Sequence, residues 1–245
     1  MTLDPRKIRC AYRLFALAAT VAGALLLTAC GSQPLSPWHT ADLGEEFTAR
    51  DADETPTFEA YLALEERLFA ELEEEVYAEV ETGAEFALVR YSKGSLADPR
   101  TRQPNWNRSF ELSTPEPRGG VLLLHGMSDS PYSLRQLGLT LRAQGFWVIG
   151  IRLPGHGTAP SGLRKARWED MAAAGRLAMQ RLVAKVGERP IHVIGYSTGA
   201  ALALNQTLNA LDDPSVHKPA SLILISPAIG VARVAALAGP AASLG

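Results

Sequence analysis

The sequence predicts an α/β fold in which a mostly parallel sheet carries helices on both faces. Short apolar runs that suit buried strands alternate with longer segments in which apolar residues recur every three or four positions. Uninterrupted apolar strands are typical of parallel sheets, because helices cover both faces of such sheets. The expected strands are 120–124, 146–151, 191–194 and 220–225, and the expected helices are 131–144, 168–186 and 200–211.

Size and composition place this sheet in one ordinary globular domain. The chain has 245 residues, of which 47% are hydrophobic and 20% charged, and these proportions exclude a disordered or fibrous protein. It shows no internal repeat and no low-complexity tract. The folded domain is expected to cover residues 85–245, after three shorter segments of different composition.

The first of these segments, residues 1–29, is expected to be a signal peptide. Four basic residues precede an uninterrupted apolar or small run over residues 14–29, which is the order of regions in such leaders. The run has 16 residues, short of the roughly 20 that span a bilayer as a helix. A permanent transmembrane anchor is therefore the less favoured interpretation.

The residues that end this run resemble the lipobox of bacterial lipoproteins, because Leu27, Thr28 and Ala29 precede Cys30. The resemblance implies that Cys30 carries lipid and becomes the mature N-terminus. The protein would then be anchored to a membrane of the bacterial cell envelope, on the periplasmic face or at the outer membrane. Cys10 would leave with the leader, so no thiol would remain for a disulfide, a metal or catalysis. The alternative is an ordinary secretory signal that ends near a cysteine.

Two segments are expected between Cys30 and the folded domain. Residues 30–56 mix Ser, Pro, Gly, Thr and acidic residues without hydrophobic periodicity, as expected of a mostly extended linker. Residues 57–84 are expected to hold an amphipathic helix with one apolar stripe. Thr57 would cap the start of this helix, and Gly83 would end it.

Acidic residues are concentrated around this helix. Residues 42–81 hold 15 acidic side chains against two arginines, whereas residues 82–245 hold 18 lysines and arginines against 10 acidic residues. One interpretation is a solvated acidic helix face. The other is that the helix docks on a basic side of the following domain and partly shields the entrance to its site.

An antiparallel hairpin is expected at one edge of the sheet, before the first parallel strand. Residues 86–92 and 105–113 alternate apolar and polar side chains on either side of a turn-rich segment that holds two prolines. Alternation around such a segment is typical of two paired strands with one face buried.

Residues 191–204 carry the most specific signal in the sequence. Their apolar run breaks at Gly195-Tyr196-Ser197-Thr198-Gly199 and resumes with helical spacing. A strand, a sharp turn and a helix in this order push the serine hydroxyl clear of the sheet, and the flanking glycines are needed because a Cβ would collide with neighbouring backbone. The pattern predicts a nucleophile at Ser197; a structural serine in a tight turn is the alternative.

Together with two earlier motifs, this turn resembles the α/β-hydrolases, in the branch of monoacylglycerol lipases, carboxylesterases and the serine aminopeptidase group. The motifs are LLLHGMSDSP at 122–131, RLPGHGTAP at 152–160 and GYSTG at 195–199, and the resemblance covers roughly residues 119–227. It implies an α/β-hydrolase fold with Ser197 as the nucleophile. The backbone N–H groups of Met127 and Thr198 would form the oxyanion hole. The resemblance implies no cofactor and no metal.

Three histidines have other expected roles. The resemblance implies that His125 shapes the oxyanion loop and that His156 structures its own loop. His192 lies within a strand and is expected to be a buried core residue with satisfied hydrogen bonds. None of the five histidines has the spacing of a metal site, such as H-E-x-x-H.

A serine nucleophile in this fold needs an acid and then a histidine later in the chain. After Ser197 the acids are Asp212 and Asp213 and the histidine is His217, and all three follow a helix that returns the chain roughly 18 Å toward the opposite edge of the sheet. Residues 226–245 contain neither type, and the resemblance implies that they begin a cap over an acyl pocket. The C-terminal strands and cap are therefore expected to be incomplete, in a truncated hydrolase or a natural short form.

These residues favour a membrane-anchored serine hydrolase that cleaves small apolar esters or acyl lipids through an acyl-enzyme on Ser197. A peptidase or an acyltransferase would use the same residues. A protein of another class, a non-catalytic lipoprotein that keeps a partial hydrolase fold to bind a lipid or a partner protein, is the alternative. No nucleic-acid partner is indicated, and the oligomeric state is left open.

Overall fold

The computed structural model describes residues 34–54 and 57–230. The expected signal peptide, Cys30 and the residues after Gly230 lie outside this part of the chain. Two compact units, Met1–Ser36 and Pro37–Gly245, divide the chain, and the second holds the sheet and its helices. No helix among the described residues is long and apolar enough to cross a membrane.

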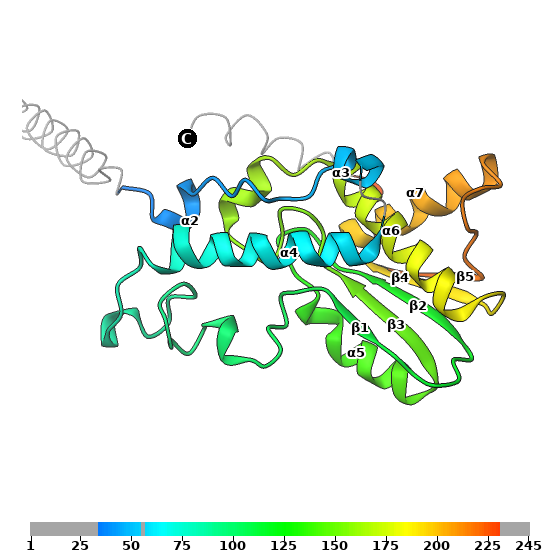
Figure 1. The fold of residues 1–245 in the computed structure, drawn as a ribbon, viewed down its shortest axis with the longest axis horizontal. Helices are drawn as coiled ribbons and strands as arrows, with labels where there is room; N and C mark the ends of the chain where they lie inside the picture. Colours follow the sequence, from blue (N-terminus) through cyan, green and yellow to red (C-terminus); the bar gives the residue numbers. More distant parts are fainter. Residues whose placement is uncertain (1–33, 55–56, 231–245) are drawn as a thin grey trace, which may run out of the picture. The chain divides into compact units, whose positions relative to one another are not determined.

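A five-stranded sheet with the order β1-β3-β2-β4-β5 forms the centre of the fold (Figure 1). The strands β2, β3, β4 and β5 are parallel, and β1 pairs with β3 in the antiparallel sense. The four expected parallel strands are confirmed to within two residues at each end. Their bounds are Phe110–Leu112 for β1, Gly119–Leu124 for β2, Phe146–Ile151 for β3, Ile191–Tyr196 for β4 and Ser221–Ile225 for β5.

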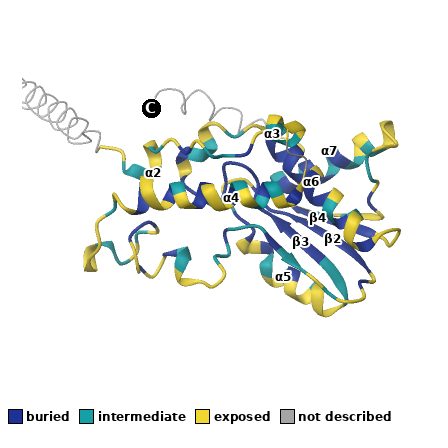
Figure 2. Cartoon of the chain, viewed as in Figure 1, coloured by how far each residue is buried: buried dark blue, intermediate teal, exposed yellow. Residues whose placement is uncertain are grey.

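Helices cover both faces of this sheet, as predicted. On one face, Leu134 of α5 (Tyr132–Ala143) joins an apolar cluster with side chains of β1, β2, β3 and β4. On the other face, α6 (Trp168–Val186) and α7 (Thr198–Asp212) contribute buried side chains to the largest cluster. The three helices agree with the expected ranges to within two residues. Figure 2 shows that the buried residues follow the strands and the inner sides of these helices.

The acidic N-terminal helix begins as predicted and ends earlier. The Thr57 hydroxyl oxygen accepts a hydrogen bond from the backbone N–H of Ala60 at 3.1 Å, so Thr57 caps α4 (Phe58–Leu72). A π-helical turn, Glu73–Tyr77, continues α4. The apolar stripe is buried through Phe58, Tyr61, Leu68, Phe69, Leu72 and Val76.

The expectation of an extended linker is wrong for residues 37–54. Two short helices form there, α2 (Pro37–Thr40) and α3 (Ala49–Glu54), and Leu43 and Phe47 between them are buried. Phe47 belongs to the same apolar cluster as the sheet and meets the Tyr61 ring edge-on, with centroids 4.9 Å apart. Buried apolar side chains, together with hydrogen bonds such as that from the Ala49 N–H to Asp170, therefore hold a segment whose composition resembles that of a linker.

The expected hairpin is also wrong. Residues 84–101 form consecutive turns with two 3₁₀ helices, Ala84–Phe86 and Pro99–Thr101. The Asp98 carboxylate favours this path, because it accepts hydrogen bonds from the backbone N–H groups of Gly94 and Arg100, each at 2.9 Å. Of residues 84–114, only β1 joins the sheet, at its edge.

The acidic segment docks on the rest of the chain through ion pairs, which agrees with the second interpretation of the uneven charge. Six acidic side chains of this segment meet basic residues that lie after residue 82. The pairs are Asp42–Lys165, Glu46–Arg152, Glu59–Arg181, Glu65–Arg152, Glu66–Arg108 and Glu73–Arg100. Shielding of the site entrance by this segment stays a prediction.

Candidate active site

Ser197 lies at the tip of the turn between β4 and α7. Its backbone has φ 53° and ψ −113°, a left-handed conformation that is strained for a residue with a side chain. A Cβ on Gly195 would lie 2.4 Å from the Gly199 oxygen, and a Cβ on Gly199 would lie 2.1 Å from the Leu124 oxygen. Only glycine fits at either position, so both glycines of the motif serve the close approach of backbone around the serine.

The end of β5 holds this turn in place. The backbone N–H of Ser197 donates a hydrogen bond to the Ile225 oxygen at 2.9 Å. The Ser197 carbonyl accepts hydrogen bonds from the N–H groups of Ala200 at 3.1 Å and Ala228 at 3.2 Å. Because β5 and the residues after it bond the Ser197 backbone from both sides, the strained conformation is fixed by the fold around it.

The loop that follows β2 lies against the serine turn. A Cβ on Gly126 would come within 3.3 Å of the Ser197 Cβ and 3.0 Å of the Tyr196 ring. Met127 follows and is half exposed, and Ser128 has a positive φ of 56°. Among the described residues, the amides of Met127 and Thr198 donate no hydrogen bond to another protein atom. An oxyanion hole needs N–H groups that are not bonded to other protein atoms, and both amides meet this requirement. The oxyanion hole itself stays a prediction.

Ser197 also stands directly before the first residue of α7, a helix of 15 residues. The unpaired N–H groups in the first turn of a helix carry a partial positive charge, which favours an anion at this end. A negative charge that develops on a substrate oxygen beside Ser197 would gain from this field.

His125 is a buried structural residue that joins two loops. Its Nδ1–H donates to the Gly126 oxygen at 2.9 Å, and its Nε2 accepts a hydrogen bond from the Leu153 N–H at 3.0 Å. Burial lowers the pKa of His125 from 6.5 to about 3. The ring is therefore neutral with both nitrogens occupied, so His125 is no general base. It ties the Gly126 loop to the loop after β3, in agreement with the role that the resemblance implied.

His156 is buried beside it. The two rings meet edge-on with centroids 5.2 Å apart, and the His156 Nδ1–H donates to the Pro154 oxygen at 2.8 Å. Burial lowers the pKa of His156. This bond holds the ring against its own loop, as expected, while Nε2 is buried without a hydrogen-bond partner in the described structure.

The expectation for His192 is wrong about burial. This side chain is half-buried on β4, where its Nδ1 lies 2.8 Å from the Ser221 hydroxyl oxygen and its ring meets Phe146 edge-on. Its hydrogen bond is satisfied, as expected. The side chain is more accessible than a core residue because Ser221, its neighbour on β5, lies on a face of that strand that is open.

Asp212, Asp213 and His217 lie away from Ser197, as expected. Asp212 is the last residue of α7, and Asp213 and His217 follow it, so the length of this 15-residue helix, about 22 Å, separates them from Ser197. The loop after α7 leads to Ser221, which pairs with His192 near the start of β4. In the described part of the chain, the Ser197 hydroxyl has no hydrogen-bond partner, and no cluster of three or more metal-ligand side chains occurs.

The sequence analysis missed a buried charge cluster next to these loops. Arg152 is fully buried and pairs with Glu46 at 2.8 Å and with Glu65 at 3.1 Å. Glu46 also accepts a hydrogen bond from the Gly155 N–H at 2.7 Å, so it holds the loop after β3. One signal was present in the sequence: Glu65 interrupts the apolar stripe of α4, four residues after Tyr61.

The parallel sheet and the strained serine between β4 and α7 define an α/β-hydrolase. The family model of the serine aminopeptidases, S33, matches residues 115–244, slightly more than half of the chain. The chain belongs to this family of hydrolases. A search of curated proteins found no match.

Several solved structures are similar to the chain, which spans about half of their length. One comes from work on LipS and LipT, two metagenome-derived lipolytic enzymes, at 27% identity and a TM-score of 0.47, covering 54% of this chain and 51% of that chain. The monoacylglycerol lipase of Paleococcus ferrophilus is 24% identical, with a TM-score of 0.40 and coverage of 54% and 49%. MenH from S. aureus is 23% identical, with a TM-score of 0.39 and coverage of 53% and 46%.

Proposed function

We propose that this protein is a serine hydrolase that cleaves carboxylic esters through an acyl-enzyme on Ser197. The observation that carries the proposal is the strained Ser197 backbone, held by β5 and enclosed by two glycines that no other residue could replace. Membership of a hydrolase family supports it. Strain that the surrounding fold enforces is typical of functional sites.

In the proposed reaction, the Ser197 oxygen attacks the ester carbonyl and its proton passes to a base. The Met127 and Thr198 N–H groups bind the developing oxyanion. The alcohol then leaves with a proton, and water releases the acid from the serine. Among the described residues, no histidine stands beside Ser197 to act as the base, so the proposal requires a base from elsewhere.

The surroundings of Ser197 support an apolar substrate, a small ester or an acyl lipid. Large apolar side chains are exposed on the segments that meet at the turn, in the loop after β2, on β4 and around the end of β5. They are Met127 at 52% exposure, Tyr196 at 41%, Ile225 at 40% and Ile229 at 58%. Exposed apolar side chains gathered at one place mark ligand or membrane contacts more often than bare surface.

Anchoring by lipid on Cys30, in a bacterial cell envelope, is part of the same proposal and is supported by the residues before that cysteine. Expression in a bacterial host with an alkyne-labelled fatty acid tests it. Label is expected on the wild-type protein and absent from Cys30→Ser, whereas Cys10→Ser keeps it. Equal labelling of wild type and Cys30→Ser would exclude this anchor.

A fluorophosphonate probe and a p-nitrophenyl ester test the catalytic proposal. The wild-type protein is expected to label and to hydrolyse the ester, and Ser197→Ala is expected to lose labelling and more than about 1,000-fold in kcat/KM. Ser215→Ala, an exposed serine beyond the far end of α7, serves as the matched control. A p-nitroanilide measured in parallel separates ester from amide cleavage. Folded wild-type protein that fails to label would contradict the proposal.

The second candidate is a non-catalytic lipoprotein that uses the fold to bind a lipid or a partner protein. The observation that favours it is the Ser197 hydroxyl, which has no hydrogen-bond partner in the described chain. This candidate predicts saturable binding of a fluorescent fatty acid without labelling by the probe. Its affinity for the fatty acid would be the same in wild type and Ser197→Ala.

A further inference from the structure

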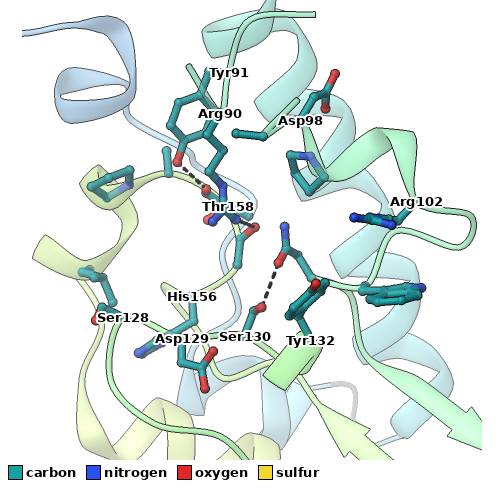
Figure 3. Close-up of a pocket in the computed structure, with 18 of the residues that line it drawn as sticks. Arg90, Tyr91, Asp98, Arg102, Ser128, Asp129, Ser130, Tyr132, His156 and Thr158 are labelled. Atoms are coloured by element: carbon teal, nitrogen blue, oxygen red, sulfur yellow. Dashed lines mark hydrogen bonds between the residues drawn. The ribbon is translucent and has the colours of Figure 1, made fainter. Parts of the chain in front are cut away.

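A cavity lies beside the loop that follows β2, and Ser197 is not among the residues that line it. It has a volume of about 470 Å³ and is lined by three segments, residues 90–107, residues 128–132 and the loop 155–163 (Figure 3). Its size falls within the range of roughly 300–1,000 Å³ that is typical of small-molecule sites. The irregular path of residues 84–101, where a hairpin was expected, provides one of its walls.

Unpartnered polar groups are concentrated at this cavity. Five buried side-chain nitrogen or oxygen atoms have no hydrogen-bond partner in the described structure, and three belong to residues that line the cavity. These are Asn107 Nδ2, His156 Nε2 and Thr158 Oγ1, on residues that are only 5%, 2% and 4% exposed. Buried polar groups without a protein partner are few in native proteins, and ordered water or a bound ion commonly satisfies them. The grouping of three such atoms on residues that line one cavity therefore favours a polar occupant.

The bonds already made by two of these side chains define what the ligand must offer. The Asn107 Oδ1 accepts a hydrogen bond from the Ser130 hydroxyl at 2.8 Å, so its free Nδ2 is a donor. The His156 Nδ1–H donates to the Pro154 oxygen, so its free Nε2 carries a lone pair and accepts. The Thr158 hydroxyl serves either role. The ligand must present acceptor oxygens to Asn107 and a hydrogen to His156.

The wall of the cavity adds positive charge. Arg90 and Arg102 line it, and neither forms an ion pair with an acidic residue of the described chain (Figure 3). The Asp98 carboxylate is paired with Arg100 at 2.8 Å, which leaves Asp129 as the acid of the wall that is not in an ion pair. Arg90 also donates a hydrogen bond to the Gly157 oxygen at 3.4 Å. Two guanidinium groups outside ion pairs, against one such carboxylate, favour an anion.

An aromatic surface lies next to these arginines. The rings of Trp106 and Tyr132 line the cavity with centroids 5.0 Å apart, and the Arg102 guanidinium lies 5.5 Å from the Trp106 ring. Aromatic rings provide a large contact surface for the carbon skeleton of an organic ligand. The cavity thus combines buried polar groups, two arginines and two aromatic rings.

We propose that this cavity binds a phosphate group, free or as an organic phosphate monoester. Its oxygens would accept hydrogen bonds from Asn107 and Thr158 and face Arg90 and Arg102. The second pKa of a phosphate monoester is about 6, and that of free phosphate is higher, so at pH 6 both keep a hydroxyl that donates to His156. The organic part of an ester would lie on Trp106 and Tyr132. The site is separate from the hydrolase proposal and stands whether or not Ser197 is catalytic.

Calorimetry on the full chain in mild detergent at pH 6 tests the ligand class with inorganic phosphate, phenyl phosphate and sulfate. Saturable phosphate binding is expected, and sulfate, which has no hydroxyl at this pH, is expected to bind about tenfold more weakly. Tighter binding of phenyl phosphate would identify a monoester as the ligand, and equal binding would identify the free ion. Equal affinity for sulfate and phosphate, or no saturable binding of either phosphate probe, would overturn the proposal.

Substitutions in the cavity test the residues. Arg90→Gln and Arg102→Gln are each expected to weaken phosphate binding about tenfold, while Arg50→Gln, an exposed arginine on α3, leaves it unchanged. Thr158→Val removes an unpartnered buried hydroxyl, so it is expected to weaken binding without lowering the melting temperature of the free protein. Full phosphate affinity in all three cavity variants would also overturn the proposal.

Discussion

At Ser197 the backbone adopts a conformation that serine avoids on its own, and hydrogen bonds made by the folded chain stabilise it. Isolated serine residues avoid φ 53° and ψ −113°, yet the bonds to Ile225 and Ala228 fix this conformation. The neighbouring glycines remove the steric obstacle, because a Cβ at Gly199 would overlap the end of β2. The sequence motif and the strained backbone are independent observations, and both identify Ser197 as the candidate site.

Gly199→Ala is expected to lower the free energy of unfolding by about 3 kcal/mol or more, because its Cβ would lie 2.1 Å from backbone that α7 and β2 hold rigidly. Urea denaturation of the two proteins measures the difference. Gly230→Ala is the control, since a Cβ there meets nothing within 4 Å, and it is expected to change stability by less than about 0.5 kcal/mol. Equal stability of Gly199→Ala and the wild type would contradict the described packing.

His125 gives the protein an expected pH dependence. Unfolded chains protonate this histidine below pH 6.5, whereas the folded state resists protonation down to about pH 3 because of burial. The unfolded state therefore binds more protons within this window, and stability falls as the pH falls from 6.5 toward 3. The buried His156, whose pKa burial also lowers, acts in the same direction.

Urea denaturation at pH 7.5, 6.5, 5.5 and 4.5 measures this effect. Below pH 6.5 each buried histidine is expected to remove up to about 1.4 kcal/mol of stability per pH unit. His39→Gln, at an exposed position on α2, is expected to leave the pH profile unchanged. A free energy of unfolding that stays constant from pH 6.5 to 5.5 would show that neither histidine is buried as described.

At the scale of elements, the N-terminal segment and the loop after β3 are joined by one buried arginine. Arg152 contacts Glu46, between α2 and α3, and Glu65 on α4. It also donates to the His156 oxygen at 3.1 Å within its own loop. A single side chain therefore connects two N-terminal elements to the loop that lines the phosphate cavity proposed above.

Arg152→Met is expected to lower the free energy of unfolding by about 3–5 kcal/mol, because two carboxylates would lose the buried charge they face. Thermal and urea denaturation measure the change. Arg67→Met is the matched control, since Arg67 pairs with Glu45 of the same segment while more than half exposed, and it is expected to lose no more than about 1 kcal/mol. Similar losses in both variants would contradict a special role for the buried cluster.

At the scale of the whole molecule, the N-terminal segment is part of the core. Phe47, Phe58 and Tyr61 belong to the apolar cluster that includes α6 and the parallel strands. At the other side, β5 is the edge of the described sheet, and its Ile223 and Ile225 are 49% and 40% exposed. The N-terminal segment thus packs in the core on the α6 side of the sheet, whereas the β5 edge is open in the described structure.

Deletion of residues 37–81 is expected to abolish cooperative unfolding and to cause aggregation, because it would expose the apolar cluster and leave Arg152 without its carboxylates. Calorimetry and light scattering measure both effects. Deletion of residues 31–36, which lie before α2, is the control and is expected to unfold as the wild type does. An unchanged melting temperature after the larger deletion would show that the segment is only a linker.

The parallel strands, the three main helices and the serine turn were predictable from the sequence, because local patterns encode them. Apolar runs and helical spacing follow from burial on the two faces of a sheet, and the glycines around Ser197 follow from sterics within a few residues. The fold class and the position of Ser197 therefore required no tertiary information.

The tertiary structure decided what depends on contacts distant in sequence. The packing of residues 37–54, the turns that replaced the hairpin and the open position of His192 are set by partners elsewhere in the chain, such as Tyr61 for Phe47. The Arg152 cluster joins residues about 90 to 110 positions apart, and the cavity beside the loop after β2 forms between three separate segments. Local sequence patterns do not predict such contacts, because the residues that form them meet only when the chain has folded.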